Sequence, residues 1–192
     1  MDGGPGGKAG RAEAPASEPM PPVWASTDHA PHVLEEIPML HTRAGPRDGN
    51  QWISRVKEEM QAVIALVRIN KEKDNDWFQI NPVNKLCTRW EGKCWTYHQG
   101  VRFEFTIHFD VPASYPATCP DLIIPHLDGK TAKIYRGGRI CLDLHFQPLW
   151  ARNVPKFGIA HALALGLGPW LSLEIPSLVS AGLLPVTGTT AR

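Results

Sequence analysis

Cysteine chemistry is the strongest functional signal in this chain of 192 residues. Cys141 lies in an irregular segment, shortly after a glycine pair that indicates a turn. Three basic residues precede the cysteine: Lys133, Arg136 and Arg139. Because the thiolate is the nucleophilic form, nearby positive charge and access for a partner would make Cys141 reactive. A small buried hydrophobe between Ile140 and Leu142 is the competing interpretation, and position alone leaves both open.

Two other clusters of reactive side chains fit their chemistry less well. Cys141, Asp143 and His145 are the residue types of a cysteine hydrolase, but residues so close in sequence seldom converge as nucleophile, base and orienting group. A zinc site would need a second tight pair of ligands, which this group lacks: Cys87, Cys94 and His98. We therefore expect no metal and no cofactor.

A helix is predicted over residues 50–70, where apolar residues recur every three or four positions. Asp48 or Asn50 would cap its start. The charged side chains of its first half fall mostly outside the apolar stripe, so we expect an amphipathic helix with those charges on the exposed face: Arg55, Lys57, Glu58 and Glu59.

Four strands are predicted after this helix, over residues 77–80, 88–97, 101–109 and 122–124. The third has the clearest period of two, with Val101, Phe103 and Phe105 alternating with polar residues. Short connections between consecutive strands favour an antiparallel four-stranded sheet with helices packed on one side, which is an α+β fold.

The remainder of the chain contains a long segment without periodicity, residues 126–155, and loops of this length are usually functional. A helix is predicted over residues 156–167 and a helical turn over 176–181. The uncharged stretch 157–173 contains His161, three glycines and Pro169, so we interpret it as a buried helix followed by a bend and expect no membrane span.

Composition predicts one folded domain flanked by two tails, and it bears on partners and location. Residues 1–32 are rich in Gly, Pro and Ala and are expected to form a flexible tail, followed by a domain over 33–186 and a short tail over 187–192. A formal net charge of +1 gives no field that would favour nucleic acid. With no secretory signal recognised and four cysteines, a cytoplasmic location with free thiols is expected.

Three motifs resemble those of ubiquitin-conjugating enzymes. Residues 115–120 resemble their Tyr-Pro-x-x-x-Pro turn, a turn that non-catalytic relatives share. Thr131, Ala132 and Lys133 stand where these enzymes usually have His-Pro-Asn, and Lys133 is eight residues before Cys141. Residues 140–143 resemble the active-site segment.

Longer strings are similar to the conjugating enzymes for the ubiquitin-fold modifier. They are AGPRD at 44–48, DNDWF at 74–78, DGKTAK at 128–133, PLWARNVPKFG at 148–158 and ALGLGPWL at 164–171. The resemblance runs from about Leu34 to Leu184. Residues 142–144 follow the general ubiquitin-class pattern more closely than the modifier-specific one.

This resemblance implies a ubiquitin-conjugating fold with an extra N-terminal helix and a shortened C-terminus. It also implies that an activating enzyme delivers the modifier to Cys141 as a glycyl thioester, and that a ligase complex directs transfer to lysines of target proteins. Lys133 would stabilise the oxyanion or the thiolate, and Thr131 would position the loop by hydrogen bonding. Trp150 and Pro148 are expected to pack under the loop.

Two other functions remain alternatives. A non-catalytic adaptor of the related fold would share the Tyr-Pro-x-x-x-Pro turn and bind partners without thioester chemistry. A cysteine hydrolase that removes modifiers would use Cys141 to cleave rather than to transfer.

Overall fold

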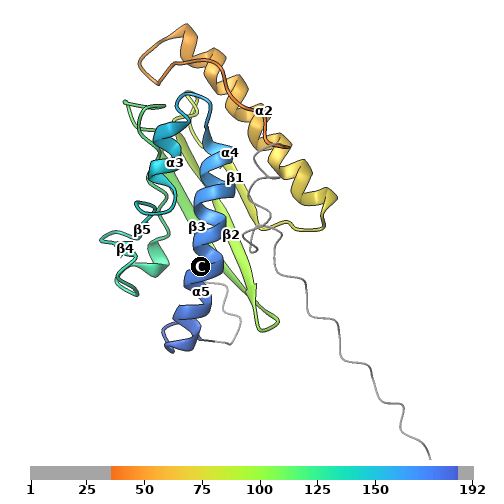
Figure 1. Cartoon of the computed structure of the whole chain (residues 1–192), viewed down its shortest axis with the longest axis vertical. Helices are drawn as coiled ribbons and strands as arrows, with labels where there is room; N and C mark the ends of the chain where they lie inside the picture. Colours follow the sequence, from red (N-terminus) through yellow and green to blue (C-terminus); the bar gives the residue numbers. More distant parts are fainter. Residues whose placement is uncertain (1–35, 186–192) are drawn as a thin grey trace, which may run out of the picture.

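The computed structural model describes residues 36–185. Both predicted tails, 1–32 and 187–192, therefore lie entirely outside the described residues, and so would an extra N-terminal helix that ends before residue 36. In chain order the elements are α2 (Asn50–Glu72), β1 (Phe78–Pro82), β2 (Arg89–His98), β3 (Val101–Asp110), η2 (Pro125–Leu127), β4 (Ile134–Tyr135), β5 (Arg139–Ile140), α3 (Gln147–Arg152), α4 (Ile159–His161), η3 (Ala162–Leu167) and α5 (Gly168–Ser180) (Figure 1).

The sheet confirms the α+β class. Strands β1, β2 and β3 form an antiparallel meander, and β2 and β3 are joined by a two-residue turn at Gln99 and Gly100, both with positive φ. Side chains alternate between buried and exposed along each strand, as period-two patterning predicts. The buried face carries Phe103, Phe105 and Ile107, which belong to the same core as the C-terminal helix, whereas the side chains of the opposite face are exposed or partly exposed.

The predicted fourth strand is reduced to a single bridging residue. Ile123 bridges His108 of β3 on one side and Arg139 of β5 on the other, and its backbone exchanges hydrogen bonds with His108 in both directions. The sheet therefore has three strands, and a separate two-stranded hairpin, β4–β5, is attached to it through residues 122–124. Pro120 and Pro125 bound this segment, and proline cannot donate to a strand ladder, which explains why the strand is so short.

Helix α2 matches the predicted helix, but its charges are arranged differently from the expectation. Arg55 and Glu59 are buried, with 0% and 1% of their surface exposed. The predicted cap is also wrong, because the helix is preceded by Gly49, and Asp48 instead accepts a hydrogen bond from the backbone N–H of Gly45. Arg55 and Glu59 form an i, i+4 ion pair, and this pairing allows both charges to face the core. Apolar periodicity alone does not reveal such a pair.

Arg55 satisfies its guanidinium with five partners. Its Nε donates to Oε1 of Glu59 at 2.8 Å. Its Nη1 and Nη2 donate to three backbone carbonyls, those of Thr42 (2.8 Å), Pro155 (2.7 Å) and Phe157 (2.6 Å), and to the Tyr115 hydroxyl (3.3 Å). A buried charge is tolerated only when it is paired and fully hydrogen-bonded, and this network meets that requirement.

Glu59 completes the network from the other side. It accepts hydrogen bonds from the Tyr115 hydroxyl and from the backbone N–H of Ile159 at 2.8 Å. Burial raises the pKa of the Glu59 carboxyl, while Arg55 and these donors act in the opposite direction. A Cβ atom at Gly158 would collide with the Glu59 carboxylate, so only glycine allows the backbone to approach it this closely.

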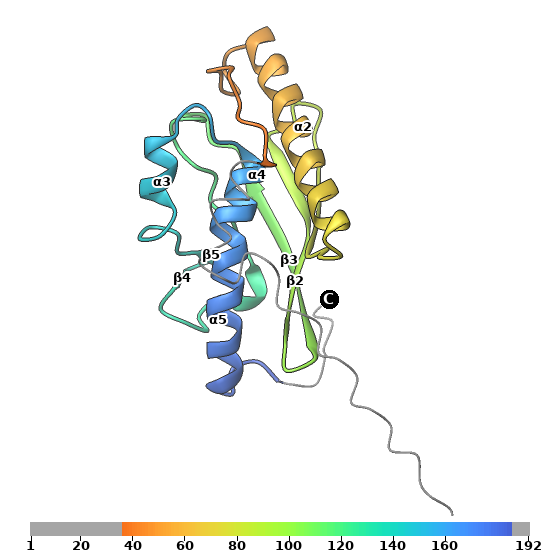
Figure 2. The ribbon, with the colours of Figure 1, turned by 45° about the vertical axis from the view of Figure 1, so that its right-hand side comes forward.

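The C-terminal helix is continuous, so the predicted bend is wrong. Residues 159–180 run through α4, the π-helical segment η3 and α5 without interruption, and Pro169 stands in the first turn of α5. By length and composition this helix is long and apolar enough to cross a membrane, with a mean hydropathy of 1.4. However, 67% of its most apolar window is buried inside the protein, and it lies along the sheet as a core helix (Figure 2).

Replacing Arg55 by methionine is expected to lower the free energy of unfolding by about 3–5 kcal/mol, because it leaves the Glu59 carboxylate buried without its cation. Urea unfolding at neutral pH measures the change. Arg68→Met, at an exposed arginine of the same helix, is the matched control and should change stability little. An equal, small loss in both variants would show that the buried pair does not hold these segments together.

Candidate active site

The β4–β5 hairpin positions Cys141. Cys141 directly follows β5, and its backbone N–H donates to the carbonyl of Lys133, which directly precedes β4, at 2.9 Å. The hairpin thus brings together two residues that are eight positions apart in sequence. At its tip Gly137 and Gly138 both have positive φ, 87° and 85°, which glycine adopts without the penalty of a side chain.

This hairpin is fixed to the bridging segment beside the sheet. The N–H of Ile124 donates to the carbonyl of Gly138 at 2.8 Å, and the N–H of Ile140 donates to the carbonyl of Leu122 at 3.0 Å. A Cβ atom at Gly138 would lie 2.6 Å from the Ile124 carbonyl oxygen, so this contact also requires glycine. Cys141 is therefore presented by a tethered hairpin and not by a free loop.

The chain after Cys141 is held by the π-helical segment. Leu142 and Phe146 are buried, and a Cβ atom at Gly166 would meet both side chains at 3.2–3.3 Å. Between them, Nε2 of His145 lies 3.3 Å from the Gly166 carbonyl oxygen. These contacts fix the direction in which the chain leaves Cys141.

Trp150 packs beneath this region, as expected, whereas Pro148 is exposed. Trp150 is 1% exposed, its ring contacts Phe146 at a centroid distance of 5.9 Å, and its Nε1 donates to the Pro116 carbonyl at 2.9 Å. Pro148 lies in the first turn of α3, where its fixed φ favours the helix start, and so its role is local rather than in packing.

Cys141 is partly exposed, in contrast to two of the other cysteines. Cys94 and Cys119 are 0% and 2% exposed, and burial raises the pKa of both thiols well above the ordinary range. A thiol sealed in an apolar core is inert, whereas a partly exposed one can meet a reagent. The interpretation of Cys141 as a buried hydrophobe therefore does not fit the structure.

Tyr135 lies beside the sulfur of Cys141, a contact that is not predicted from the sequence. Its hydroxyl is 3.5 Å from Sγ of Cys141 and donates to Oδ2 of Asp143 at 2.6 Å. The Arg139 guanidinium stacks over its ring, 4.0 Å from the centroid. The hydrogen bond to Asp143 raises the pKa of the Tyr135 phenol. The glycine pair was the available signal, because a hairpin centred on it pairs Tyr135 with Arg139.

Lys133 and Thr131 lie on the same loop. The backbone N–H of Lys133 donates to Oγ1 of Thr131 at 3.0 Å, which is the kind of contact that a loop-positioning role requires. The Lys133 ammonium is 2.6 Å from Oε1 of Glu174, a buried carboxylate of α5. Arg139 is paired with Asp121 at 3.3 Å. Carboxylates from other parts of the chain thus form ion pairs with two of the three basic residues noted near Cys141.

The structure does not assemble Cys141, Asp143 and His145 into a hydrolase triad. Asp143 accepts from Tyr135, and His145 is directed at the Gly166 carbonyl, so neither is arranged as base and orienting group for the thiol. Among residues 36–185, no group of His, Cys, Asp or Glu side chains is arranged to hold a metal ion.

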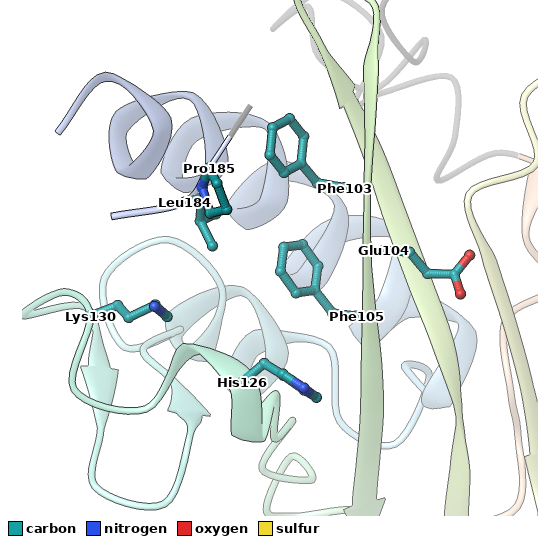
Figure 3. Close-up of a pocket in the computed structure, with 7 residues that line it drawn as sticks. All are labelled: Phe103, Glu104, Phe105, His126, Lys130, Leu184 and Pro185. Carbon is teal, nitrogen blue, oxygen red and sulfur yellow. The ribbon is translucent and has the colours of Figure 1, made fainter. Parts of the chain in front are cut away.

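A cavity of about 240 Å³ lies away from the cysteine, between β3, η2 and the segment after α5 (Figure 3). Phe103 and Phe105 point toward it, Leu184 and Pro185 form the opposite wall, and Glu104 points away. Cys141 does not line it. A partly exposed cysteine apart from this cavity suits a reaction partner that arrives as a flexible protein terminus.

The α+β fold, with a partly exposed cysteine on a hairpin beside the sheet, fits the ubiquitin-conjugating class. The model of the family described as ubiquitin-fold modifier-conjugating enzyme 1 matches residues 30–185. The chain belongs to this family. It is therefore a conjugating enzyme of the ubiquitin-fold modifier pathway, a transferase.

Relatives of the same description cover the same part of the chain. The Trichoplax adhaerens protein is 60% identical over 151 residues, which are 79% of this chain and 89% of the relative. The Mus musculus protein is 57% identical over 152 residues, which are 79% of this chain and 90% of the relative.

Two solved structures show weaker similarity. One, described as a novel ubiquitin-conjugating enzyme, has a TM-score of 0.34 and 14% identity, covering 62% of this chain and 88% of that one. The other, the H. polymorpha ubiquitin conjugating enzyme Pex4p in complex with the soluble domain of Pex22p, has a TM-score of 0.35 and 19% identity, covering 65% and 88%. The sequence matches, and not these structures, establish the family.

Alkylation of the native protein with iodoacetamide should modify Cys141 readily and leave Cys94 and Cys119 unmodified until denaturant is added, because the last two thiols are buried. Peptide mapping by mass spectrometry gives the extent of modification at each site. Protection of Cys141 equal to that of Cys94 would contradict the accessible site described above.

Proposed function

We propose that Cys141 is the residue that carries the modifier. In this proposal the activating enzyme transfers the ubiquitin-fold modifier to Cys141 as a glycyl thioester, and a ligase complex then directs transfer to lysine amines of target proteins. The observation that carries it is the position of Cys141, partly exposed on a tethered hairpin in a member of a conjugating-enzyme family.

Thioester exchange needs a sulfur that two different proteins can approach in turn. The hairpin supplies this because hydrogen bonds to residues 122–124 and the contacts below Leu142 fix the sulfur in place, while its side chain remains partly exposed. Holding a reacting group in position lowers the entropic cost of each encounter. No cofactor takes part in this reaction scheme.

Lys133 is proposed to stabilise negative charge formed during transfer. Attack on a thioester builds charge on the carbonyl oxygen, and preorganised donors aimed at that charge are usually the largest contribution to catalysis. Lys133 is joined to Cys141 through its backbone carbonyl, and Glu174 and Thr131 hold its side chain and its loop. Its ammonium acts either on the oxyanion or on the thiolate.

The reaction is proposed to take place in the cytoplasm. All four cysteines are free thiols in the structure, a state that suits a reducing compartment. Nucleic acid is not proposed as a partner, since the near-zero net charge provides no general attraction. The alternative of a non-catalytic adaptor does not fit a chain that belongs to a family of conjugating enzymes.

Incubation with the activating enzyme, the modifier and ATP should give an adduct that thiol reductant cleaves. Cys141→Ser should convert it into an adduct that resists reductant, because an oxygen ester replaces the thioester. Gel electrophoresis with and without reductant distinguishes the two. Cys87→Ser, at the other partly exposed cysteine, is the matched control and should charge normally. A reductant-sensitive adduct on Cys141→Ser would overturn the assignment, and so would the absence of an adduct on the wild-type enzyme.

Lys133→Ala should slow discharge of the charged enzyme to free lysine by about tenfold, the effect of losing one hydrogen bond to a charged group. Lys85→Ala, at an exposed lysine outside the site, is the control. Slower discharge with normal alkylation of the free thiol would place Lys133 at the oxyanion, and slowing of both would place it at the thiolate. Unchanged discharge would remove Lys133 from the chemistry.

A further inference from the structure

The hydroxyl of Tyr135 lies between two acceptors. Oδ2 of Asp143 is 2.6 Å away and Sγ of Cys141 is 3.5 Å away, which is within hydrogen-bonding range for sulfur. A phenol has a single hydrogen to donate. In the resting enzyme the carboxylate, the closer and charged acceptor, receives it.

The ring of Tyr135 is held so that its oxygen stays beside the sulfur. Tyr135 and Arg139 are paired across the hairpin, and the Arg139 guanidinium covers the ring at 4.0 Å. Asp121 in turn binds Arg139 at 3.3 Å. The ring is held by Arg139 and by the paired backbone of the hairpin. Rotation about the bond between the ring and the hydroxyl oxygen is therefore enough to move the hydrogen from one acceptor to the other.

We propose that Tyr135 is a further catalytic residue, which donates its hydrogen bond to the sulfur of Cys141 whenever that sulfur carries negative charge. Asp143 is a positioning residue that holds the hydroxyl between these steps. The inference rests on the proposed function, since it takes Cys141 as the carrier of the thioester.

The role in discharge can be written bond by bond. The nitrogen of a lysine amine forms a bond to the thioester carbonyl carbon, the carbon–sulfur bond breaks, and its electron pair remains on the sulfur of Cys141. The amine loses its extra proton to solvent. Rotation of the Tyr135 O–H from Asp143 to the sulfur stabilises the departing thiolate, and no proton is transferred between them. The same contact stabilises the thiolate before it attacks an incoming thioester.

Two of the three basic groups near the sulfur are paired with carboxylates in the resting structure. The Lys133 ammonium is bound to Glu174 of α5, and Arg139 is bound to Asp121. The Asp143 carboxylate accepts from the Tyr135 hydroxyl beside the sulfur, so its negative charge repels negative charge that forms on the sulfur. Tyr135 and Asp143 therefore act on the thiolate in opposite directions, which makes the proposal testable.

The test uses Tyr135→Phe, Asp143→Asn and the double variant. Thiolate is measured at one pH by its ultraviolet absorbance, as the difference from Cys141→Ser, and by the rate of alkylation with iodoacetamide. Tyr135→Phe should lower the amount of thiolate because a donor is lost. Asp143→Asn should raise it, because a like charge is removed and the hydroxyl is free to turn to the sulfur. Adding Tyr135→Phe to Asp143→Asn should reverse most of that gain.

A purely structural role predicts a different pattern. If Tyr135 and Asp143 only brace the loop, both single variants change thiolate reactivity in the same direction, or Tyr135→Phe leaves it unchanged in both backgrounds. Either result would overturn the inference. Tyr97→Phe and Asp76→Asn, at an exposed tyrosine and an exposed aspartate elsewhere, are the controls, and thermal unfolding verifies that every variant is folded.

Discharge of the charged enzyme to free lysine completes the test. Tyr135→Phe should slow it by about tenfold, the effect of losing a hydrogen bond to a charged atom. Because the thiolate measurement needs no modifier, the two proposals can fail separately. A wild-type enzyme that charges on Cys141 while Tyr135→Phe changes neither thiolate nor discharge would reject only the role of Tyr135, and absence of charging would reject the proposed function.

Discussion

One buried ion pair joins the segments on which the rest of the structure depends. Arg55 and Glu59 lie one turn apart on α2, fully removed from solvent, and together with Tyr115 they satisfy one another's hydrogen-bonding groups. Breaking such a pair by removing one partner is costly, because the other charge is left in the core. The network therefore fixes which chain segments meet at this point.

Those segments connect α2 to the helix that supports the candidate active site. The guanidinium binds the carbonyls of Pro155 and Phe157, and the carboxylate binds the N–H of Ile159, so the start of the long C-terminal helix is fixed relative to α2. Nearby, the buried ring of His161 stacks on the ring of Phe157, with the two ring centroids 4.5 Å apart. Burial lowers the pKa of His161 to about 4, so its imidazole is neutral at physiological pH. The same helix then places Gly166 against Leu142 and Phe146, in the chain that follows Cys141.

The candidate site thus combines a fixed support with a partly exposed sulfur. The hairpin is tethered to the bridging segment, and the chain that follows Cys141 rests on the helix at Gly166, while the sulfur remains partly exposed. Around it, Lys133 and Arg139 are held by carboxylates from α5 and from the segment before the hairpin. Charge near the sulfur is therefore arranged by contacts between distant parts of the chain.

Local patterning explains which parts of this arrangement could be predicted from sequence. Helix α2, the three strands of the meander and the turn at Gly137 and Gly138 before Cys141 follow from periodicity and turn residues within short windows. The burial of Arg55 and Glu59, the loss of the fourth strand and the unbroken helix across Pro169 could not be predicted, because each depends on partners far along the chain. Proximity in sequence groups Asp143 with Cys141 and His145, whereas its contact with Tyr135 forms only when the hairpin closes.

The most direct test of the account is the intact mass of the enzyme after charging, followed by peptide mapping under conditions that preserve thioesters. The account predicts an added mass equal to that of the ubiquitin-fold modifier less one water, located on the peptide that contains Cys141. Location of that mass on another residue, or the mass of a different modifier, would contradict it.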